Sequence, residues 1–259
     1  MLHAAFTGLA VIAAMAFVTW IVSLVRRDVS VVDSLWSLFI TTGGVVYAVV
    51  LPASGARPVL MLALAVGWAL RLSIYISWRN HGQPEDRRYQ QMRARNQPNF
   101  ELKSLYLIFG LQAVLAWIVS APFLAGFGGT NPLNAFDLAG AALAAFGIVF
   151  EAIADQQMAR FKADAANQGK VMDRGLWRYT RHPNYFGECC AWWGLGLIAL
   201  AAGGAWWSLV SPLLMTTLLL KVSGVTLLEA DIGERRPAYR DYIARTNAFV
   251  PGRPRTAAA

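Results

Sequence analysis

Long runs of apolar residues alternate along this chain with short polar stretches. Seven runs of span length are present, at 4–25, 31–51, 58–78, 104–126, 134–157, 186–203 and 206–228. About 20 apolar residues in a helix cross the hydrocarbon core of a bilayer, because each residue adds about 1.5 Å of rise. The pattern therefore predicts an all-α integral membrane protein with seven transmembrane helices.

Basic residues gather in every second connection between these runs. The basic connections are 26–27, 79–103, 158–185 and the segment after 228, whereas those near 52–57, 127–133 and 203–205 contain one basic residue, Arg57. Because cytosolic loops carry the excess of Lys and Arg, we expect an N-terminus outside and a cytosolic C-terminus. The same rule explains the formal net charge of +8, so no nucleic-acid partner is expected.

Composition supports one membrane domain. Of the 259 residues, 56% are hydrophobic and 15% charged, whereas a soluble domain has roughly 25% charged residues. The first apolar run lacks a preceding basic segment and a small-residue cleavage site, so we expect it to be a retained span. Cys189 and Cys190 are adjacent, which disfavours a structural disulfide. We expect the protein to bind no metal ion. We also expect it to contact membrane lipids and to be a monomer.

Ionisable side chains inside the predicted spans share one level, the cytosolic half. They are Asp33, Arg71, Glu151, Asp155, Glu188, Lys221 and Glu229. A charge at membrane depth costs about 2.5–3.5 kcal/mol on insertion scales, so such residues are functional-site candidates. Their common level predicts a polar cavity open to the cytosol. The alternatives are structural pairs, Asp33 with Arg71 and Lys221 with Glu229, or a Glu229 side chain that reaches the interface.

The stretch GLWRYTRHPNYFGECC, residues 175–190, is unusually polar for the start of an apolar run. Arg178, Arg181 and His182 offer cationic or donor groups to an anion. Asn184 and Glu188 are four residues apart and share a helix face, where Glu188 can accept hydrogen bonds from an amide or a ribose.

Two further cations, Lys162 and Arg174, belong to the same connection. Together with the arginines of the motif they predict a phosphate-binding cluster, because the guanidinium fork matches phosphate oxygens. The alternative interpretation is a basic loop that touches anionic lipid headgroups.

This stretch, with EAIADQQMARFK upstream and LLEADIGERRPAYRDYIARTNAFVP downstream, resembles the steroid 5α-reductase superfamily and, within it, a bacterial branch of membrane reductase-like proteins. The resemblance is strongest from about residue 150. It implies an NADPH-dependent enzyme, similar to 3-oxo-5α-steroid 4-dehydrogenases, that reduces a C=C bond conjugated to a ketone in a lipophilic substrate. Residues 1–126 would shape the substrate pocket and 127–259 would hold NADPH, at the cytosolic face of the bacterial inner membrane.

The resemblance also implies roles for individual residues. The matching positions are Asp155 and Lys162 for the adenosine and phosphate end, Tyr179, Asn184 and Glu188 for the ribose and nicotinamide, Arg71 and Arg79 as basic positions that reach the cofactor, and Tyr242 and Arg245 in the C-terminal cap. Glu151 lies one turn before Asp155 on the same helix face, so we include it in the predicted cofactor site. The chain has no GxGxxG sequence, so the binding mode would not be a Rossmann one.

The predicted catalytic end departs from the family. Its steroid enzymes use a Gln-Glu pair in the second span and a Tyr in the third, whereas VVDSLW leaves Asp33 as the nearest carboxyl, with Trp36 on the same face, and Trp68 takes the Tyr position. Negative charge that develops on the substrate oxygen needs a hydrogen-bond donor. Asp33, Arg71 and Tyr75 remain alternatives for that donor.

A second enzyme class shares part of the motif. Membrane methyltransferases of the isoprenylcysteine and phospholipid type resemble this chain in RHP-x-Y-x-G and a later Glu, to which His182, Pro183, Tyr185 and Glu229 correspond. The basic loop favours the reductase, because a dinucleotide carries several phosphate charges while S-adenosylmethionine is cationic. A transporter or lipid-binding scaffold is the third alternative, although transporter sites lie nearer the midplane.

Overall fold

The computed structural model of the chain describes residues 1–203, 205–222, 224–229 and 232–255, without the side chains of 227 and 235. Helices make up 78% of the structure, and the described residues contain no strand. The chain divides into two compact units, Met1–Leu138 with Gly196–Ser211, and Ala139–Leu195 with Pro212–Ala259. Each unit is described by itself.

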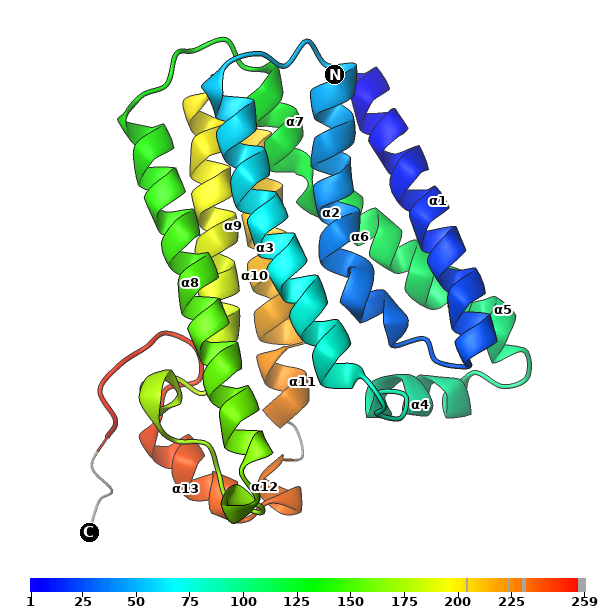
Figure 1. Cartoon of the computed structure of the whole chain (residues 1–259), viewed down its shortest axis with the longest axis vertical. Helices are drawn as coiled ribbons and strands as arrows, with labels where there is room; N and C mark the ends of the chain where they lie inside the picture. Colours follow the sequence, from blue (N-terminus) through cyan, green and yellow to red (C-terminus); the bar gives the residue numbers. More distant parts are fainter. Residues whose placement is uncertain (204, 223, 230–231, 256–259) are drawn as a thin grey trace. The chain divides into compact units, whose positions relative to one another are not determined.

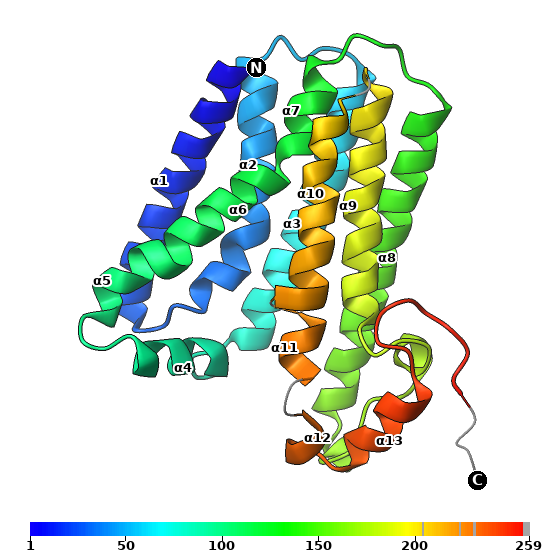
Figure 2. The same cartoon turned by 180° about the vertical axis from the view of Figure 1, so that it is seen from behind.

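Unit 1 consists of long helices joined by short turns (Figure 1). Its elements are α1 (Leu2–Arg26), α2 (Val31–Val50), α3 (Ala56–Asn80), α4 (Arg87–Arg95), α5 (Phe100–Ser104), the π-helix η1 (Leu105–Gly110), α6 (Leu111–Val119), α7 (Ala121–Gly128), the first turn of α8 (Ala135–Ala163), the end of α9 (Pro183–Ala201) and η4 (Trp206–Leu209). Helix α2 packs against α1, α3 and α6. Figure 2 shows α5 and α6 crossing α1 and α2 obliquely.

Unit 2 is built around the rest of α8 and most of α9. It also contains η2 (Ala165–Asn167), η3 (Gly175–Arg178), α10 (Val210–Thr217) from Pro212 on, the π-helix η5 (Leu218–Val222), α11 (Val225–Glu229), α12 (Ile232–Arg235) and α13 (Ala238–Arg245). Short α12 and α13 lie at the end of α8, and the chain beyond α13 turns back beside the η3 loop (Figure 1).

Five described helical segments are long and apolar enough to cross a membrane: Leu2–Arg26, Val31–Val50, Ala56–Asn80, Phe100–Gly128 and Ala135–Ala163. They coincide with the first five runs of the sequence pattern. The sixth run forms α9, which has 19 residues. The seventh run contains the apolar helix Trp206–Val222, which is shorter than the five helices of span length, and α11 (Val225–Glu229).

A buried ion pair joins the first turns of α3 and α8 in unit 1. Arg57 is 6% exposed, and it donates from Nε and Nη2 to the two carboxylate oxygens of Asp137 over 2.7 and 2.8 Å. Its remaining donors reach the backbone oxygens of Asn131 and Pro132, and the backbone N–H of Asn134 donates to Asp137. The guanidinium is therefore fully compensated, as a buried charge requires.

Glycines bring α8 and α9 into direct backbone contact in unit 2. A Cβ added to Gly187 would lie 2.7 Å from the backbone N of Glu151 and the backbone O of Gly147, and one on Gly194 would lie 2.5 Å from the backbone N of Ala144. Small residues at such spacing let helices pack closely in a membrane, where no hydrophobic drive brings them together. This seam sets the lateral position of every polar group on the two helices.

The seam generates the first prediction. Gly187→Ala places a methyl group against backbone atoms that cannot move aside, so we expect a loss of about 1–3 kcal/mol of stability. Gly67→Ala is the matched control, because a Cβ on Gly67 of α3 meets nothing within 4 Å. Thermal unfolding of the detergent-purified variants measures both. Equal melting temperatures for the two variants would contradict the seam.

Candidate functional site

The GLWRYTRHP stretch is held against α8 by its own polar groups. Gly175 adopts a left-handed φ of 57°, and a Cβ there would meet the side chain of Gln157. That same side chain accepts a hydrogen bond from the backbone N–H of Leu176 over 2.9 Å. The indole of Trp177 donates to the backbone O of Ala154 over 3.0 Å. The glycine is thus needed twice, for its dihedral and for the close approach to α8.

Arg181 lies at the centre of unit 2 and its donors are used internally. It donates from Nε and Nη2 to the two oxygens of Glu229 over 2.7 and 2.6 Å, and from Nη1 to the backbone O of Ile243 and Thr246. His182 also contacts Glu229, with 2.9 Å between Nε2 and Oε1, and its ring stacks on Tyr185. We call Arg181, His182 and Glu229 the RHE cluster.

The charge of Glu229 is fixed by this cluster. Burial alone would raise the pKa of the carboxyl group, but the hydrogen bonds from Arg181 and His182 outweigh it and lower the pKa from 4.5 to about 2. The partners of Glu229 are thus Arg181 and His182 rather than Lys221, the partner that the sequence suggested. The carboxylate is ionised and anchors the turn that begins α9.

The C-terminal segment caps the same turn. The backbone N–H of Arg181 donates to the backbone O of Asn247 over 2.9 Å, and that of Gly252 donates to the backbone O of Tyr179 over 3.0 Å. Thr180 donates to the backbone O of Phe249, and the buried Tyr242 hydroxyl donates to the backbone O of Trp177. The sequence reasoning placed Tyr242 among the cofactor residues, and in this structure its hydroxyl is bonded to the protein backbone.

Beneath the RHE cluster, polar side chains are buried on the facing sides of α8 and α9. Glu151, Asp155 and Glu188 are 2%, 6% and 7% exposed. Asn184 lies in the first turn of α9, where its Oδ1 is buried and has no hydrogen-bond partner within the described residues. A buried acceptor of this kind is rare in proteins, and it is a position that a ligand N–H or O–H can fill.

The remaining predicted cofactor residues of unit 2 lie on its surface. Lys162, Arg174, Arg178 and Tyr179 are exposed, the first at the end of α8 and the others in and beside η3. Arg245 pairs with the partly exposed Asp173. The structure thus separates the arginines of the motif into an inward Arg181 and outward Arg174 and Arg178.

In unit 1, Asp33 is bound by the first basic connection. One carboxylate oxygen accepts from the Tyr89 hydroxyl over 2.6 Å, and the other accepts from Nη2 of Arg88 over 2.8 Å. Arg88 also pairs with Asp86, which caps α4. The expected hydrogen-bonded partner, Arg71, is thus replaced at both carboxylate oxygens by residues of α4.

Sequence reasoning counted Arg88 only as a loop charge and did not select Tyr89. Burial and the neighbouring Asp33 carboxylate raise the pKa of Tyr89 well above its usual 10, so its hydroxyl remains protonated. The sequence feature that could have identified Tyr89 is its place as an aromatic residue in the otherwise polar segment of α4.

The other candidates of unit 1 lie on the same helices as expected. Trp36 donates from its indole to the backbone O of Gln112 over 3.3 Å. The Tyr75 ring lies near Trp78 and beneath the guanidinium of Arg79, 5.8 Å from the ring centre. Arg71 is half-buried on α3. Arg71 and Arg79 belong to unit 1, whereas the other predicted cofactor residues belong to unit 2. The described residues contain no group of three or more potential metal ligands.

Apolar helices of span length, with buried carboxylates, amides and guanidinium groups near their ends, define a class of polytopic helical membrane protein. A family model matches residues 19–246, described as a protein of unknown function, DUF1295. The chain belongs to this family, which is steroid 5α-reductase-like.

The chain is also similar to an uncharacterized protein of Schizosaccharomyces pombe. The two are 26% identical over 270 residues, an alignment that covers 90% of this chain and 76% of the yeast protein. No solved structure matches the chain with significance.

The RHE cluster generates a prediction about pH. Glu229→Gln leaves the buried Arg181 without a counter-charge, so we expect a loss of about 3–5 kcal/mol near neutral pH. Because the pKa of Glu229 is lowered from 4.5 to about 2, the stabilisation is complete above pH 4.5 and is lost as the pH falls toward 2. Wild-type and variant melting temperatures should therefore converge in acid.

The matched control is Asp173→Asn, which breaks the partly exposed pair with Arg245. It should cost no more than about 1 kcal/mol, as surface pairs do. A difference between wild type and Glu229→Gln that stays constant from pH 7 to pH 3 would show that the carboxylate charge is not what stabilises the cluster.

Proposed function

We propose that this protein is a membrane reductase that uses NADPH to reduce a C=C bond conjugated to a ketone in a lipophilic, steroid-like substrate. The observation that carries the proposal is the buried, unbonded Oδ1 of Asn184 among the buried carboxylates of α8 and α9. Family membership supports it, because the family is steroid 5α-reductase-like.

The residues of unit 2 fit a dinucleotide. The carboxamide of a nicotinamide has N–H donors that match the Asn184 oxygen. Carboxylates such as Glu188 and Asp155 accept hydrogen bonds from ribose hydroxyl groups, and both are buried where a bound group would be shielded from water. In this proposal Asn184 and Glu188 hold the nicotinamide end, and Asp155 with Glu151 holds the adenosine end.

In this proposal the exposed cations of unit 2 bind the phosphates of NADPH. Lys162, Arg174 and Arg178 are outward-facing and close in sequence, and guanidinium groups bind phosphate oxygens in pairs. Arg181, His182 and Tyr242 are positioning residues in this proposal, because their polar atoms are already bonded within unit 2. They hold the η3 loop and the start of α9 in place, with Arg245 and Tyr179 at the rim.

For catalysis, NADPH supplies the hydride, and the chain must stabilise negative charge on the substrate oxygen. Asp33 accepts hydrogen bonds at both oxygens, so we assign it to orienting Tyr89 and Arg88 rather than to donating a proton. The hydroxyl of Tyr89, which remains protonated, joins Arg71 and Tyr75 as donor candidates. Trp36, on the face of α2 that carries Asp33, would line the substrate side.

The proposed topology has seven crossings, with an external N-terminus, a cytosolic C-terminus and the site at the cytosolic face of the bacterial inner membrane. Support comes from the ends of the described helices. The last residues of α1 and α8 carry Arg26, Arg160 and Lys162, whereas the connection between α2 and α3 carries no basic residue before Arg57. Basic residues at these helix ends, and none in the connection after α2, are what the positive-inside rule expects. We propose a monomer with a lipophilic enone as its partner.

One contact favours a second candidate function, an S-adenosylmethionine-dependent methyltransferase. The structure brings His182 of RHP-x-Y-x-G to within 2.9 Å of the later Glu229, with Tyr185 stacked on the imidazole. These are the residues shared with the isoprenylcysteine and phospholipid enzymes. Against it, Glu229 is already neutralised by Arg181, which lessens its use for a sulfonium cation.

Cofactor choice gives the decisive experiment. Equilibrium titration of the purified protein should give tighter binding of NADPH than of NADH, because the extra phosphate adds charge-assisted hydrogen bonds. The double variant Arg174→Gln, Arg178→Gln should raise the NADPH Kd by about tenfold or more and the NADH Kd less. The double variant Arg26→Gln, Arg95→Gln, at two exposed arginines of unit 1, is the charge-matched control.

The same titration separates the candidates. S-adenosylmethionine binding without NADPH binding would replace the reductase by the methyltransferase, and binding of neither would favour a scaffold. Glu188→Gln should weaken NADPH and NADH equally at an unchanged melting temperature. A lower melting temperature with intact affinity would make Glu188 a structural residue instead.

A second prediction concerns Asp33. In single-turnover NADPH oxidation with a lipophilic enone, Asp33→Asn keeps an acceptor for Tyr89 and should retain more activity than Asp33→Ala, which frees both Tyr89 and Arg88. Tyr89→Phe removes the hydroxyl and leaves Arg88 in place. Loss in Tyr89→Phe with a normal melting temperature would make Tyr89 the donor, whereas wild-type rates in Asp33→Ala would exclude Asp33 and leave Tyr75 and Arg71.

A further inference from the structure

A cavity lies at the end of α1 in unit 1, and none of the residues that line it is assigned to the proposed reductase site. Its volume is about 350 Å³, within the range of about 300–1,000 Å³ found for ligand sites. Leu24, Val29 and Phe100 provide apolar walls, and Arg27 and Arg93 provide the basic ones. Glu101 and Ser104 complete the lining, so the cavity combines apolar side chains with charged ones.

The two arginines differ in what they have left to bind. Arg93 donates to Glu85 and Glu101, and its guanidinium lies over the ring of Phe100, 4.6 Å from the ring centre. Arg27 is exposed, and its side chain makes no hydrogen bond or ion pair within the described residues. Arg93 is thus shared between two carboxylates and its donors are used, whereas the donors of Arg27 remain open to a ligand.

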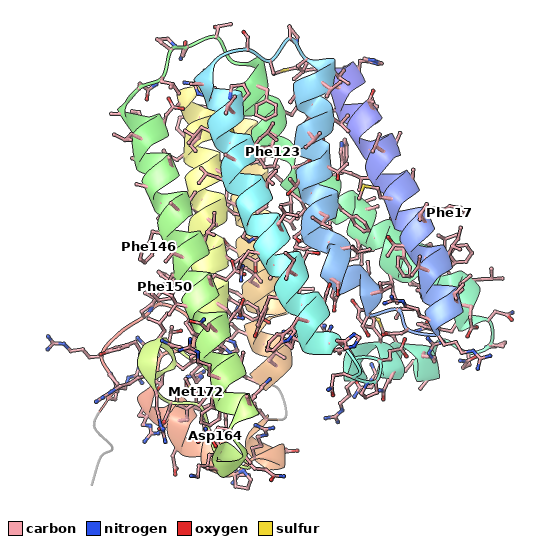
Figure 3. All side chains as sticks on the ribbon, viewed as in Figure 1. Phe17, Phe123, Phe146, Phe150, Asp164 and Met172 are labelled. Atoms are coloured by element: carbon pink, nitrogen blue, oxygen red, sulfur yellow. The ribbon has the colours of Figure 1, made fainter. Side chains whose placement is uncertain are left out.

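The apolar wall continues along the outside of α1. Phe17, Ile21 and Leu24 follow one another at helical spacing on one face, and Phe17 and Ile21 are 48% and 44% exposed. Figure 3 shows Phe17 on the outer side of α1. The indole of Trp20 donates to the backbone O of Glu101 over 2.9 Å, and tryptophan is enriched in the headgroup region of membranes. A ligand in the cavity therefore has an apolar track leading from it into the bilayer.

We propose that this cavity binds the headgroup phosphate of an anionic phospholipid through Arg27, with an acyl chain along the Phe17–Leu24 face of α1. A soluble phosphate shares the charge but would gain nothing from Leu24, Val29 and the exposed face. A zwitterionic lipid shares the acyl chain but has a headgroup without net charge. The combination of wall and charge fits the anionic lipid.

The test is native mass spectrometry of the purified protein with phosphatidylglycerol and phosphatidylcholine. Wild type should retain more phosphatidylglycerol. Arg27→Asn removes the cation while tolerating the left-handed φ of 55° at this residue, and should weaken phosphatidylglycerol binding about fivefold. Arg27→Lys should retain most of the binding.

Arg26→Gln is the matched control, because Arg26 is the adjacent exposed arginine and does not line the cavity. Equal losses for Arg26→Gln and Arg27→Asn would reduce the effect to general surface charge and overturn the site. Equal retention of both lipids by wild type would overturn it without any variant. Displacement of the lipid by millimolar inorganic phosphate would reassign the cavity to a soluble phosphate.

Discussion

A buried guanidinium group needs a carboxylate to compensate its charge. In unit 2 this group is Arg181, just before the start of α9. Glu229 comes from 48 residues further along the chain, after the last apolar run, to provide that carboxylate. The third nitrogen of the guanidinium is also bound, by the backbone oxygens of Ile243 and Thr246. One charge therefore determines where the final helices and the C-terminal segment pass.

The position of Arg181 also sets the geometry of the polar groups below it. Helix α9 begins two residues later, so fixing Arg181 fixes the axial level of Asn184 and Glu188. The glycine seam then fixes their distance from α8, because the two backbones touch at Gly147 and Gly187. The ion pair between Arg181 and Glu229 thus sets the position of Asn184 and Glu188 along the axis of α9. The glycines, which have no side chain, set the distance between α8 and α9. The two constraints are independent, and both are needed to bury carboxylates at a defined place.

The hydropathy pattern predicted much of this architecture because it reports a property of each segment alone. Helices α1, α2, α3 and α8 lie where the apolar runs lie, and Glu151 and Asp155 are buried on α8. The pattern did not predict that Leu218–Val222 would be a π-helix, since the change from α- to π-helical hydrogen bonding leaves composition unchanged.

The hydrogen-bond and ion-pair partners of the polar side chains were harder to predict from the sequence. Residue type alone does not show whether an arginine in a connection faces inward or outward. The sequence therefore suggested Arg181 as a phosphate ligand and Arg88 as a loop charge, whereas both pair with carboxylates of the protein. The contacts that decide, from Arg181 to Glu229 and from Tyr89 to Asp33, join residues about 50 apart and leave no periodic trace. Only the folded chain brings them together.

The pair between Arg57 and Asp137 has a consequence for the order in which the chain is assembled. The two residues are separated by 80 positions, and the second belongs to the first turn of α8. As the chain is synthesised, α2 and α3 can associate while Arg57 still lacks its carboxylate. The guanidinium of Arg57 therefore stays without its counter-charge until the first turn of α8 has been synthesised, and unit 1 is completed later still, by Gly196–Ser211. The order of synthesis thus leaves one buried cation of unit 1 dependent on a carboxylate made 80 residues later.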